Sequence, residues 1–432
     1  MRDKIKVGLM GFGTVGTGVV RIVDSNKEDL YKQTGAEIEV SRILVRDTEK
    51  ERAVYVNPDI ITTDPHELIY DEDVKVVIEV MGGIEPARTY LLEAIEQGKH
   101  IVTANKDLMA IHGAELTKKA QQFGCDLYYE ASVAGGIPIL NAIVEGFSSD
   151  RIKQIMGIVN GTTNYILTKM SNEHASFDDV LREAQELGYA EADPTADVEG
   201  LDAARKMAIL ASLGFHVGMN LDDVSVRGIS QVTLEDMKYG EQLGYTMKLI
   251  GIAKKDDDFI EVSVEPTLVK NSHPLATVNG VFNAVYVYGE AVGETMFYGP
   301  GAGELPTATA VLSDLVTVVK NIKLGITGRS MATPYHEKKL KSDKEIYSKY
   351  FIRLIVNDES GVLAQIAKLM AEEGISVEKV FQEPYPNEDK KAELILVTHK
   401  TSKKQVDTIL NAFEQVDFVE KVKSSYRVEG GE

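Results

Sequence analysis

Ile5-Lys-Val-Gly-Leu-Met10 runs directly into Gly11-Phe-Gly13-Thr-Val-Gly16, and no other segment says as much about the fold. Residues 5–10 predict a strand, and residues 14–25 carry the apolar periodicity of a helix. Between them, the first glycine makes a tight turn, the second lets the backbone approach a pyrophosphate, and the third lets the helix pack on the strand. The helix N-terminus then faces the phosphates. Glycines also cluster in ordinary turns, but this position between strand and helix favours a dinucleotide-binding site.

Short apolar runs continue to alternate with helical patterns up to residue 133. Helices are expected at residues 14–25, 87–97 and 108–123, and Gly98 and Gly124 stand where the C-caps of the last two belong. Strands are expected at residues 5–10, 37–45, 76–80, 100–104 and 127–131. The alternation predicts a parallel, doubly wound sheet, so residues 1–133 are expected to form a Rossmann-type domain that binds NAD(P).

The remainder of the chain divides into a mixed α+β region, a linker and a tail. For residues 134–325 the expected helices are 176–187 and 198–213, and the expected strands are 262–269, 284–288 and 291–297. A helix that starts near Pro306 is expected to return to the first sheet and complete it at about residues 300–325. Residues 326–349 are polar and predict a linker. Residues 350–432 follow the βαββαβ order of a ferredoxin-like unit.

Composition narrows the class of protein. With 432 residues the chain has room for two or three domains with buried cores. The net charge of −20 argues against a nucleic-acid partner, although a small anionic cofactor needs only a local positive site. The single cysteine, Cys125, fits a reducing compartment and is expected to be a small buried hydrophobe. No apolar run is long enough for a membrane span and no signal peptide is visible, so a cytoplasmic location is expected.

Two positions at strand ends bear on the cofactor. At the end of the second strand an acidic residue selects NAD, whereas an arginine can hold the 2′-phosphate of NADP. Arg46 precedes Asp47 here, which favours NADP and leaves NAD possible; the alternative is a solvated charge pair. Thr103-Ala-Asn-Lys106 ends the fourth strand, at the sheet edge where ligands bind. Lys106 could meet a cofactor phosphate or join a proton relay, and the alternative is a surface lysine that caps a loop.

An acidic segment, Glu191-Ala-Asp-Pro-Thr-Ala-Asp197-Val-Glu-Gly-Leu-Asp202-Ala-Ala-Arg-Lys206, is the strongest candidate for chemistry. Asp202 and Lys206 are four apart and therefore share one face of a helix. Such a pair is usually a surface ion pair of little consequence. The run Met207-Ala-Ile-Leu-Ala211 is apolar, however, which predicts burial beyond the lysine. Burial lowers the pKa of a lysine and nearby carboxylates raise it, so the net direction stays open.

Two further motifs have open interpretations. Glu130-Ala-Ser132-Val-Ala-Gly135-Gly-Ile137-Pro joins one carboxylate to a glycine-rich turn. Such a turn can supply hard oxygen ligands to a cation, or it can be a simple turn with a capping glutamate. Asn160-Gly-Thr-Thr-Asn164 precedes a helical run, and helix capping explains it fully, although a bound carbonyl could also use its donors.

Taken together, these motifs resemble those of the homoserine dehydrogenase family over nearly the whole chain. The resemblance implies reversible, NAD(P)-dependent interconversion of L-aspartate 4-semialdehyde and L-homoserine in threonine, methionine and isoleucine biosynthesis, with residues 134–325 as the catalytic and dimerisation domain. It implies that Lys206 is the acid–base group, that Asp202 and Glu191 bind homoserine, and that Asp197 supports the lysine and the amino-acid end. Lys106 would lie at the junction of cofactor and substrate. Beside the glycines, the implied cofactor-lining residues are Phe12, Thr14, Val15, Arg46, Ser132, Gly188 and Gly303. The implied sodium ligands are Glu130 and the backbone of Val133, Gly135 and Ile137.

The tail resembles an ACT domain, a module that often senses amino acids. Family members carry a turn of the type Asp-x-Pro-Gly after the first strand, whereas Asp358-Glu-Ser-Gly361 has Ser360 in place of the proline. An effector such as threonine is therefore less well supported than the fold. The resemblance is to the monofunctional form, since no aspartokinase segment is seen, and it implies a homo-oligomer, either a dimer or a tetramer. The alternatives are another Rossmann-type reductase of amino-acid semialdehydes and a catalytically silent amino-acid sensor.

Overall fold

The computed structural model describes residues 2–331, 334–386, 388 and 390–430. It contains two compact units that interleave along the chain. Unit 1 consists of Met1–Gly161, Asp202–Val224 and Phe282–Lys338, and unit 2 of Thr162–Leu201, Ser225–Val281 and Lys339–Glu432. The domain boundaries drawn from the sequence stay predictions. Among the described residues, none of the helices combines the length and the apolar character needed to cross a membrane.

A six-stranded parallel sheet forms the N-terminal part of unit 1, as the sequence predicts. Its strand order is β3-β2-β1-β4-β5-β6, which is the Rossmann order. The strands are β1 (Lys4–Met10), β2 (Glu37–Leu44), β3 (Ile61–Thr62), β4 (Val74–Glu79), β5 (His100–Thr103) and β6 (Leu127–Tyr128). β3 is not predicted from the sequence. β6 is shorter than expected because a 3₁₀ turn occupies Glu130–Ser132.

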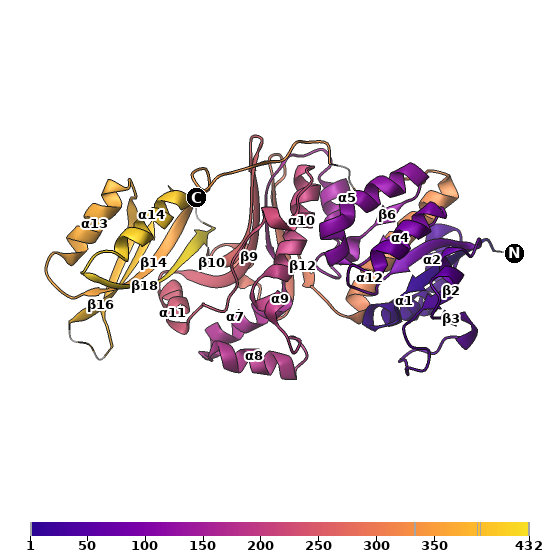
Figure 1. Cartoon of the computed structure of the whole chain (residues 1–432), viewed down its shortest axis with the longest axis horizontal. Coiled ribbons are helices and arrows are strands. Elements are labelled where there is room, and N and C mark those ends of the chain that lie inside the picture. Colours follow the sequence, from indigo (N-terminus) through magenta and orange to yellow (C-terminus); the bar gives the residue numbers. More distant parts are fainter. Residues whose placement is uncertain (1, 332–333, 387, 389, 431–432) are drawn as a thin grey trace. The chain divides into compact units, whose positions relative to one another are not determined.

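Helices flank this sheet, and Figure 1 shows α1 beside α12 and α4 beside α5. They are α1 (Thr14–Ser25), α2 (Lys27–Thr34), α3 (His66–Ile69), α4 (Ala87–Glu96), α5 (Lys106–Phe123) and α12 (Glu304–Leu324). α12 contacts α1, β4 and β5. α5 begins two residues before its expected start because the side chain of Asn105 caps it, accepting from the backbone N–H of Leu108.

Unit 1 also holds a small antiparallel arrangement and one buried helix. β7 (Ile152–Ile158), β11 (Phe282–Gly289) and β12 (Gly293–Pro300) pair in the order β7-β11-β12. The short helix α6 (Ile139–Asn141) precedes β7. The single helix expected at residues 198–213 is in fact two, α9 (Thr195–Val198) and α10 (Leu201–Phe215). Gly200, with φ +79°, makes the break between them.

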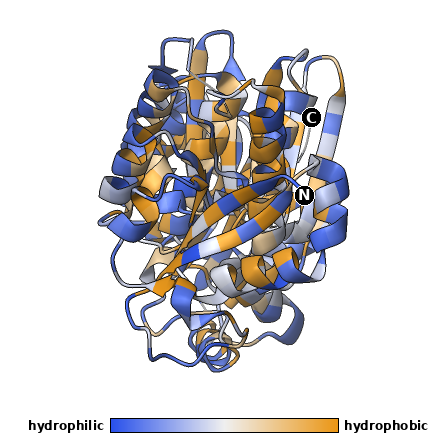
Figure 2. Ribbon diagram, turned by 90° about the vertical axis from the view of Figure 1, so that its right-hand side faces the viewer, coloured by the Kyte–Doolittle hydropathy of each residue, from blue (hydrophilic) through white to orange (hydrophobic). Residues whose placement is uncertain are grey.

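Unit 2 combines helices with a long hairpin. Its helices before the tail are α7 (Gly161–Glu173), α8 (Phe177–Glu186), α9 and α11 (Leu234–Gln242). β9 (Tyr245–Asp256) and β10 (Phe259–Lys270) pair antiparallel, and β8 (Ser225–Val226) pairs with β10. Over the chain as a whole, Figure 2 shows apolar residues in the strands and on the inner helix faces, with hydrophilic residues on the outer helix faces.

The tail is a ferredoxin-like unit, as predicted. Its elements are β14 (Tyr347–Asn357), α13 (Val362–Glu372), β15 (Val377–Pro384), β16 (Lys391–Thr398), β17 (Thr401–Ser402), α14 (Lys403–Phe413) and β18 (Val419–Glu429). The strands are antiparallel in the order β18-β14-β16-β15. β18 also pairs with β10. The predicted linker is partly structured, since β13 (Lys339–Leu340) pairs with β10 and β14 starts at Tyr347.

Candidate active site

Helix α10 holds Asp202 and Lys206 one turn apart and buries both. Asp202 is 3% exposed and Lys206 is 9% exposed. The ammonium group of Lys206 donates to Asp202 Oδ2 at 2.7 Å and to the carbonyl oxygen of Val159 at 2.7 Å. The surface-pair interpretation is therefore wrong for these two residues. They are anchored because the rest of α10, from Met207 onward, is packed into the core.

Two more side chains complete the cluster around Asp202. Lys106, the first residue of α5, forms an ion pair with Asp202 Oδ1. The side-chain amide of Asn160 donates to Asp202 Oδ2 at 2.9 Å. Burial alone would raise the pKa of Asp202, but the charges of Lys206 and Lys106 hold it well below the usual range. Asp202 is thus an ionised carboxylate that orients two cations.

A buried network behind the cluster fixes the start of α5. Glu79, at the end of β4, accepts from the hydroxyl of Thr103 at 2.6 Å and from the N–H of Met81 at 2.8 Å. Thr103 Oγ1 in turn accepts from the N–H of Asn105 at 3.0 Å, and Asn105 caps the helix that begins with Lys106. Burial raises the pKa of Glu79. Sequence reasoning did not identify Glu79, because only the fold brings the ends of β4 and β5 together.

The three glycines after β1 occupy the positions that the motif requires. Gly11 has φ +105°, and an added Cβ would lie 2.8 Å from the carbonyl oxygen of Val80. At Gly16 an added Cβ would lie 2.2 Å from the carbonyl oxygen of Gly11. Gly13 faces open space, with no atom within 4 Å of such a Cβ. The N-terminus of α1 is therefore open toward the point where the strand order reverses, between β1 and β4.

A cavity of about 440 Å³ adjoins this turn. Gly11, Phe12 and Gly13 line one part of it, and Arg46, Asp47, Lys50 and Arg52 line another. The guanidinium of Arg52 lies 5.5 Å from the centre of the Phe12 ring and donates to the carbonyl oxygen of Asp47. The predicted Arg46 thus has two cationic neighbours that the sequence reasoning missed. Their closeness in sequence to the end of β2 could have predicted that Lys50 and Arg52 lie near Arg46.

The other predicted cofactor residues lie in different settings. Thr14 and Val15 form the first turn of α1. Ser132 is buried, and its hydroxyl donates to the carbonyl oxygen of Tyr129 at 2.6 Å. Gly303 precedes α12 with φ +126°. Gly188 belongs to unit 2, where it follows α8 with φ +76°.

The predicted substrate residues Glu191 and Asp197 also belong to unit 2. Glu191 is exposed, and Asp197 is half-buried in α9. Asp193, between them, accepts from the N–H and the hydroxyl of Thr195. The roles of Glu191 and Asp197 toward substrate, like that of Gly188 toward cofactor, stay predictions.

The predicted cation site is built around Glu130, which is 1% exposed. Its carboxylate oxygens accept from the N–H groups of Leu140 and Asn141, at 2.8 and 2.7 Å, so Glu130 does cap this turn. Its role as a cation ligand stays a prediction. Asp314 of α12 accepts from the N–H of Glu130 at 2.8 Å. Burial raises the pKa of Glu130 to about 7 and that of Asp314 to about 8.

The other groups in this turn that could bind a cation are main-chain carbonyl oxygens. Val133 and Ile137 are buried, and Gly135 has φ +54°. An added Cβ at Gly135 would lie 2.5 Å from the carbonyl oxygen of Gly301, so the turn is tightly enclosed. Within the described part of the chain, no group of three or more His, Cys, Asp or Glu side chains could hold a metal ion. One carboxylate with carbonyl oxygens is a hard donor set of low charge, which fits a monovalent cation better than a transition metal.

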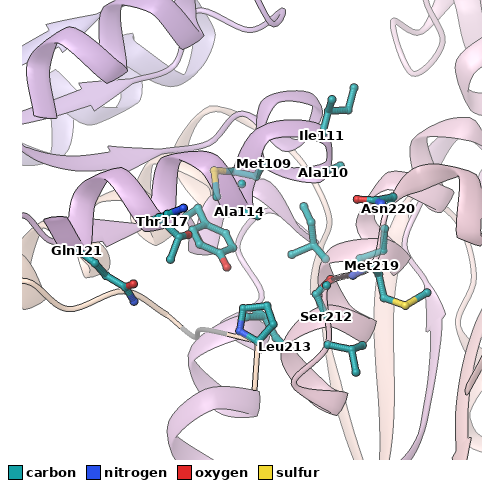
Figure 3. A pocket seen from close by; sticks show the side chains of 18 residues that line it. Met109, Ala110, Ile111, Ala114, Thr117, Gln121, Ser212, Leu213, Met219 and Asn220 are labelled. Carbon is teal, nitrogen blue, oxygen red and sulfur yellow. Dashed lines mark hydrogen bonds between the residues drawn. The ribbon is translucent and has the colours of Figure 1, made fainter. Parts of the chain in front are cut away.

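A second cavity of unit 1 lies apart from these residues. It measures about 270 Å³ and lies between α5 and the C-terminal half of α10, as Figure 3 shows. Met109, Ile111 and Leu213 contribute to its mainly apolar lining, and the hydroxyl of Ser212 accepts from the N–H of Met219. Lys106, Asp202 and Lys206 do not line it. Cys125 is buried elsewhere in the unit, and burial raises the pKa of its thiol to about 11, as expected for a structural cysteine.

Comparison with known proteins gives matches along the chain. The profile of the homoserine dehydrogenase NAD-binding domain matches residues 11–130, that of homoserine dehydrogenase residues 138–316, and that of the ACT domain residues 350–418. A homoserine dehydrogenase of Bacillus subtilis is 56% identical over 426 residues, which cover 99% of this chain and 98% of that protein.

Solved structures are similar as well. A crystal structure of a homoserine dehydrogenase from Thiobacillus denitrificans has a TM-score of 0.94 and 41% identity, and the match covers 99% of this chain and 98% of that one. A hyperthermophilic archaeal homoserine dehydrogenase in complex with NADPH has a TM-score of 0.61 and 27% identity, over 73% of this chain and 97% of that one.

Proposed function

The chain belongs to the homoserine dehydrogenase family, and on that premise we propose that Lys206 is the general acid and base of its reaction. The enzyme is an NAD(P)-dependent oxidoreductase that interconverts L-aspartate 4-semialdehyde and L-homoserine. The observation that carries the role of Lys206 is its buried ammonium group, bonded to the ionised Asp202 and to the carbonyl oxygen of Val159.

In the direction of reduction, protonated Lys206 donates to the carbonyl oxygen of the semialdehyde as negative charge develops there. When bound, the reduced nicotinamide cofactor would supply the hydride. In the direction of oxidation, neutral Lys206 takes the proton of the homoserine hydroxyl. Asp202 is held between Lys206, Lys106 and Asn160, so it fixes the position of the ammonium group before the substrate enters.

The remaining substrate contacts are proposed on chemical grounds. Both substrates carry an ammonium group, which needs anionic partners. Asp202, Glu191 and Asp197 are the proposed partners. Lys106 is proposed to lie at the junction of cofactor and substrate, because it stands at the carboxyl end of β5, the edge at which ligands bind in such sheets.

The test is a pair of substitutions at Lys206. Lys206→Ala should lower kcat by roughly 10²–10⁴-fold, while NADPH binding, followed by the fluorescence of the dihydronicotinamide, stays near the wild-type value. Lys206→Arg keeps the positive charge, but its guanidinium does not release a proton in proteins, so it should be nearly as inactive. Turnover of Lys206→Ala close to that of the wild type would refute the assignment.

We also propose that the enzyme prefers NADPH. The cavity is lined by three cationic residues, Arg46, Lys50 and Arg52, and by one carboxylate, Asp47. Its net positive charge favours the binding of the 2′-phosphate of NADPH. A monovalent cation, sodium, is proposed at Glu130 with the main-chain oxygens of Val133, Gly135 and Ile137, because this hard donor set fits such an ion. Bound there, it would supply positive charge beside the buried carboxyl groups.

A homo-oligomer, either a dimer or a tetramer, is proposed because ACT units commonly pair their sheets, and an ACT profile matches residues 350–418. β12 also stands at the edge of its strand arrangement with Met296 and Tyr298 exposed, which suits pairing with a second copy. Light scattering of the full chain should give a mass of at least twice 47.5 kDa. A monomer at micromolar concentration would contradict this.

A further inference from the structure

The cavity of about 270 Å³ within unit 1, between helix α5 and the C-terminal half of helix α10, has no part in the reaction proposed above. Figure 3 shows Met109 and Thr117 of α5 on one side of it, with Leu213 of α10 and Met219 on the other. An apolar cavity of about 150 Å³ is already large enough to bind benzene. The cavity of unit 1 can therefore hold a somewhat larger ring compound.

The cavity opens to solvent at one end. Among its lining residues Ile209, Leu213 and Val217 are buried, whereas Ile111 and Ala114 of α5 are exposed and form its mouth. The side chain of Ile111 is large and apolar, yet the residue is 47% exposed. A ligand can therefore enter beside α5 and bury its apolar part against α10 and the segment that follows it.

Two hydroxyl groups in the lining make no hydrogen bond to any of the described residues. They belong to Tyr129, which follows β6, and to Thr117 of α5, and these residues are only 6% and 7% exposed. Burial raises the pKa of Tyr129, so its hydroxyl stays protonated and can donate. The hydroxyl of Ser212, by contrast, already donates to the carbonyl oxygen of Ala208 at 2.7 Å. Most buried polar groups have a partner, so the two free hydroxyls indicate a ligand with a hydrogen-bond acceptor.

The charge of the lining narrows the chemistry of this ligand. Lys118 is the one charged residue among the described lining residues, and it is exposed. A charged group at the buried end would lose its hydration without gaining an ionic partner, which is costly. The ligand that fits is therefore uncharged, unlike the anionic group expected beside Arg46.

We propose that this cavity binds a small, uncharged molecule with an aromatic or branched apolar body and one hydrogen-bond acceptor, of the aryl ketone or amide type. Its acceptor would receive hydrogen bonds from Tyr129 and Thr117, and its apolar body would contact Met109, Leu213 and Met219. The acidic cluster around Asp202 contributes no residue to this site.

Such a ligand would lie between the two helices that carry the proposed catalytic cluster. Met109 comes three residues after Lys106 on α5, and Ile209 comes three residues after Lys206 on α10, so each lies one turn from a lysine. Lys106 already pairs with Asp202, so a ligand that shifts α5 against α10 can only loosen this contact. We therefore expect inhibition that does not compete with homoserine. This effect, unlike the binding itself, rests on the proposed roles of Lys106 and Lys206.

The binding test uses the full chain and two probes, acetophenone and ethylbenzene, which have similar shapes but differ in the carbonyl acceptor. In ligand-observed NMR titrations acetophenone should bind with a dissociation constant of about 1 mM or below, and excess homoserine should not displace it. Tyr129→Phe should weaken acetophenone by about 3- to 10-fold and leave ethylbenzene unaffected, because one hydrogen bond is lost. The variant should fold, since the Tyr129 hydroxyl has no partner to lose among the described residues.

Two further variants complete the binding test. Tyr128→Phe is the matched control, because Tyr128 is the neighbouring buried tyrosine and does not line the cavity, so both probes should bind as to the wild type. Ala114→Phe fills the mouth from an exposed helix position and should abolish the binding of both probes. Failure of acetophenone to bind the wild type, or binding that survives Ala114→Phe, would overturn the site. Equal losses of the two probes in Tyr129→Phe would overturn the role of the acceptor.

The kinetic test measures homoserine oxidation with saturating acetophenone. The kcat should fall by about twofold or more in the wild type and should not change in Ala114→Phe. A rise in KM for homoserine with kcat unchanged would place the probe in the active site and overturn the proposal. Binding without any kinetic effect would overturn the coupling to Lys106 alone. Because binding is measured without turnover, failure of the acid–base role of Lys206 would appear separately, in the kinetics of its own variants.

Discussion

Replacement of Asp202 by asparagine should weaken both the stability of unit 1 and its chemistry. The carboxylate is 3% exposed and is contacted by the ammonium groups of Lys206 and Lys106 and by the amide of Asn160. Asparagine keeps the shape but removes the charge, and its NH₂ group would face other donors. Both lysines would lose the carboxylate that orients them.

The magnitude follows from the burial of each partner. Removal of one partner from a buried ion pair costs about 3–5 kcal/mol. The side chain of Lys106 is 37% exposed and can regain water, so we expect the lower end of this range, about 3 kcal/mol. For a domain of 150–250 residues this corresponds to a fall of roughly 6–12 °C in the unfolding midpoint. Loss of lysine orientation should also lower kcat by roughly 10²-fold or more.

The effect on stability has a defined pH dependence. Because the folded pKa of Asp202 lies below the unfolded value of about 3.9, its contribution is fully present above that pH and is lost as the pH falls through the folded pKa. The difference between wild type and Asp202→Asn should therefore be constant from pH 8 to pH 5 and shrink below about pH 4.

Far-UV circular dichroism is the suitable probe, since the chain has no tryptophan. Asp107→Asn is the matched control, because Asp107 pairs with Arg205 at 2.9 Å across the same two helices, with side chains 33% and 23% exposed. That partly exposed pair should contribute about 1 kcal/mol or less, with kcat retained. If Asp202→Asn melts and turns over like Asp107→Asn, the cluster does not act as described.

Arg46→Ala should weaken the binding of NADPH more than that of NADH, because it removes a cation from the cavity beside Asp47. Equal losses of affinity for the two cofactors, measured by fluorescence titration, would contradict a role for Arg46 in binding the 2′-phosphate. At the proposed cation site the folded pKa values of Glu130 and Asp314 lie above their unfolded values, so both groups lose stabilising free energy as the pH rises through about 7 and 8. Sodium chloride should therefore raise the melting temperature, relative to choline chloride of equal ionic strength, more at pH 8 than at pH 6. An equal response in Glu130→Gln would contradict a site at Glu130.

Sequence patterns predicted the elements whose ends are marked by residues nearby in the chain. Helix α1 has the bounds, residues 14–25, that its apolar periodicity predicts. β9 was not predicted, and Lys248 shows why. This lysine is 1% exposed within the strand, where it donates to the carbonyl oxygen of Val278 and to the side chain of Asn279. A lysine within an apolar run is normally expected to face solvent. Lys248 can be buried because its ammonium group finds hydrogen-bond partners about thirty residues away in the chain.

The same distinction applies to the site. The turn from Gly11 to Gly16 was predictable because a strand followed by a tight turn and a helix needs glycine at these positions. The pair of Asp202 and Lys206 was predictable because residues four apart on a helix lie on the same face. The contact of Lys106 with Asp202 spans 96 positions and was not derivable from periodicity. Nor was the amide of Asn160, for which helix capping was the better interpretation.

The turn at Glu130 shows how a distant residue changes the meaning of a local motif. Near residue 130 the sequence contains one carboxylate and several glycines, which suits a capping glutamate as well as a cation ligand. Helix α12 brings Asp314 against this turn, so two carboxyl groups share a buried space. Burial raises both pKa values, and the charge of Glu130 raises that of Asp314 further. Two such groups stay ionised together only if positive charge lies beside them. A bound monovalent cation would provide it. The N–H groups of Leu140 and Asn141 donate to Glu130 and the side-chain amide of Asn141 donates to Asp314, but these donors carry no net charge.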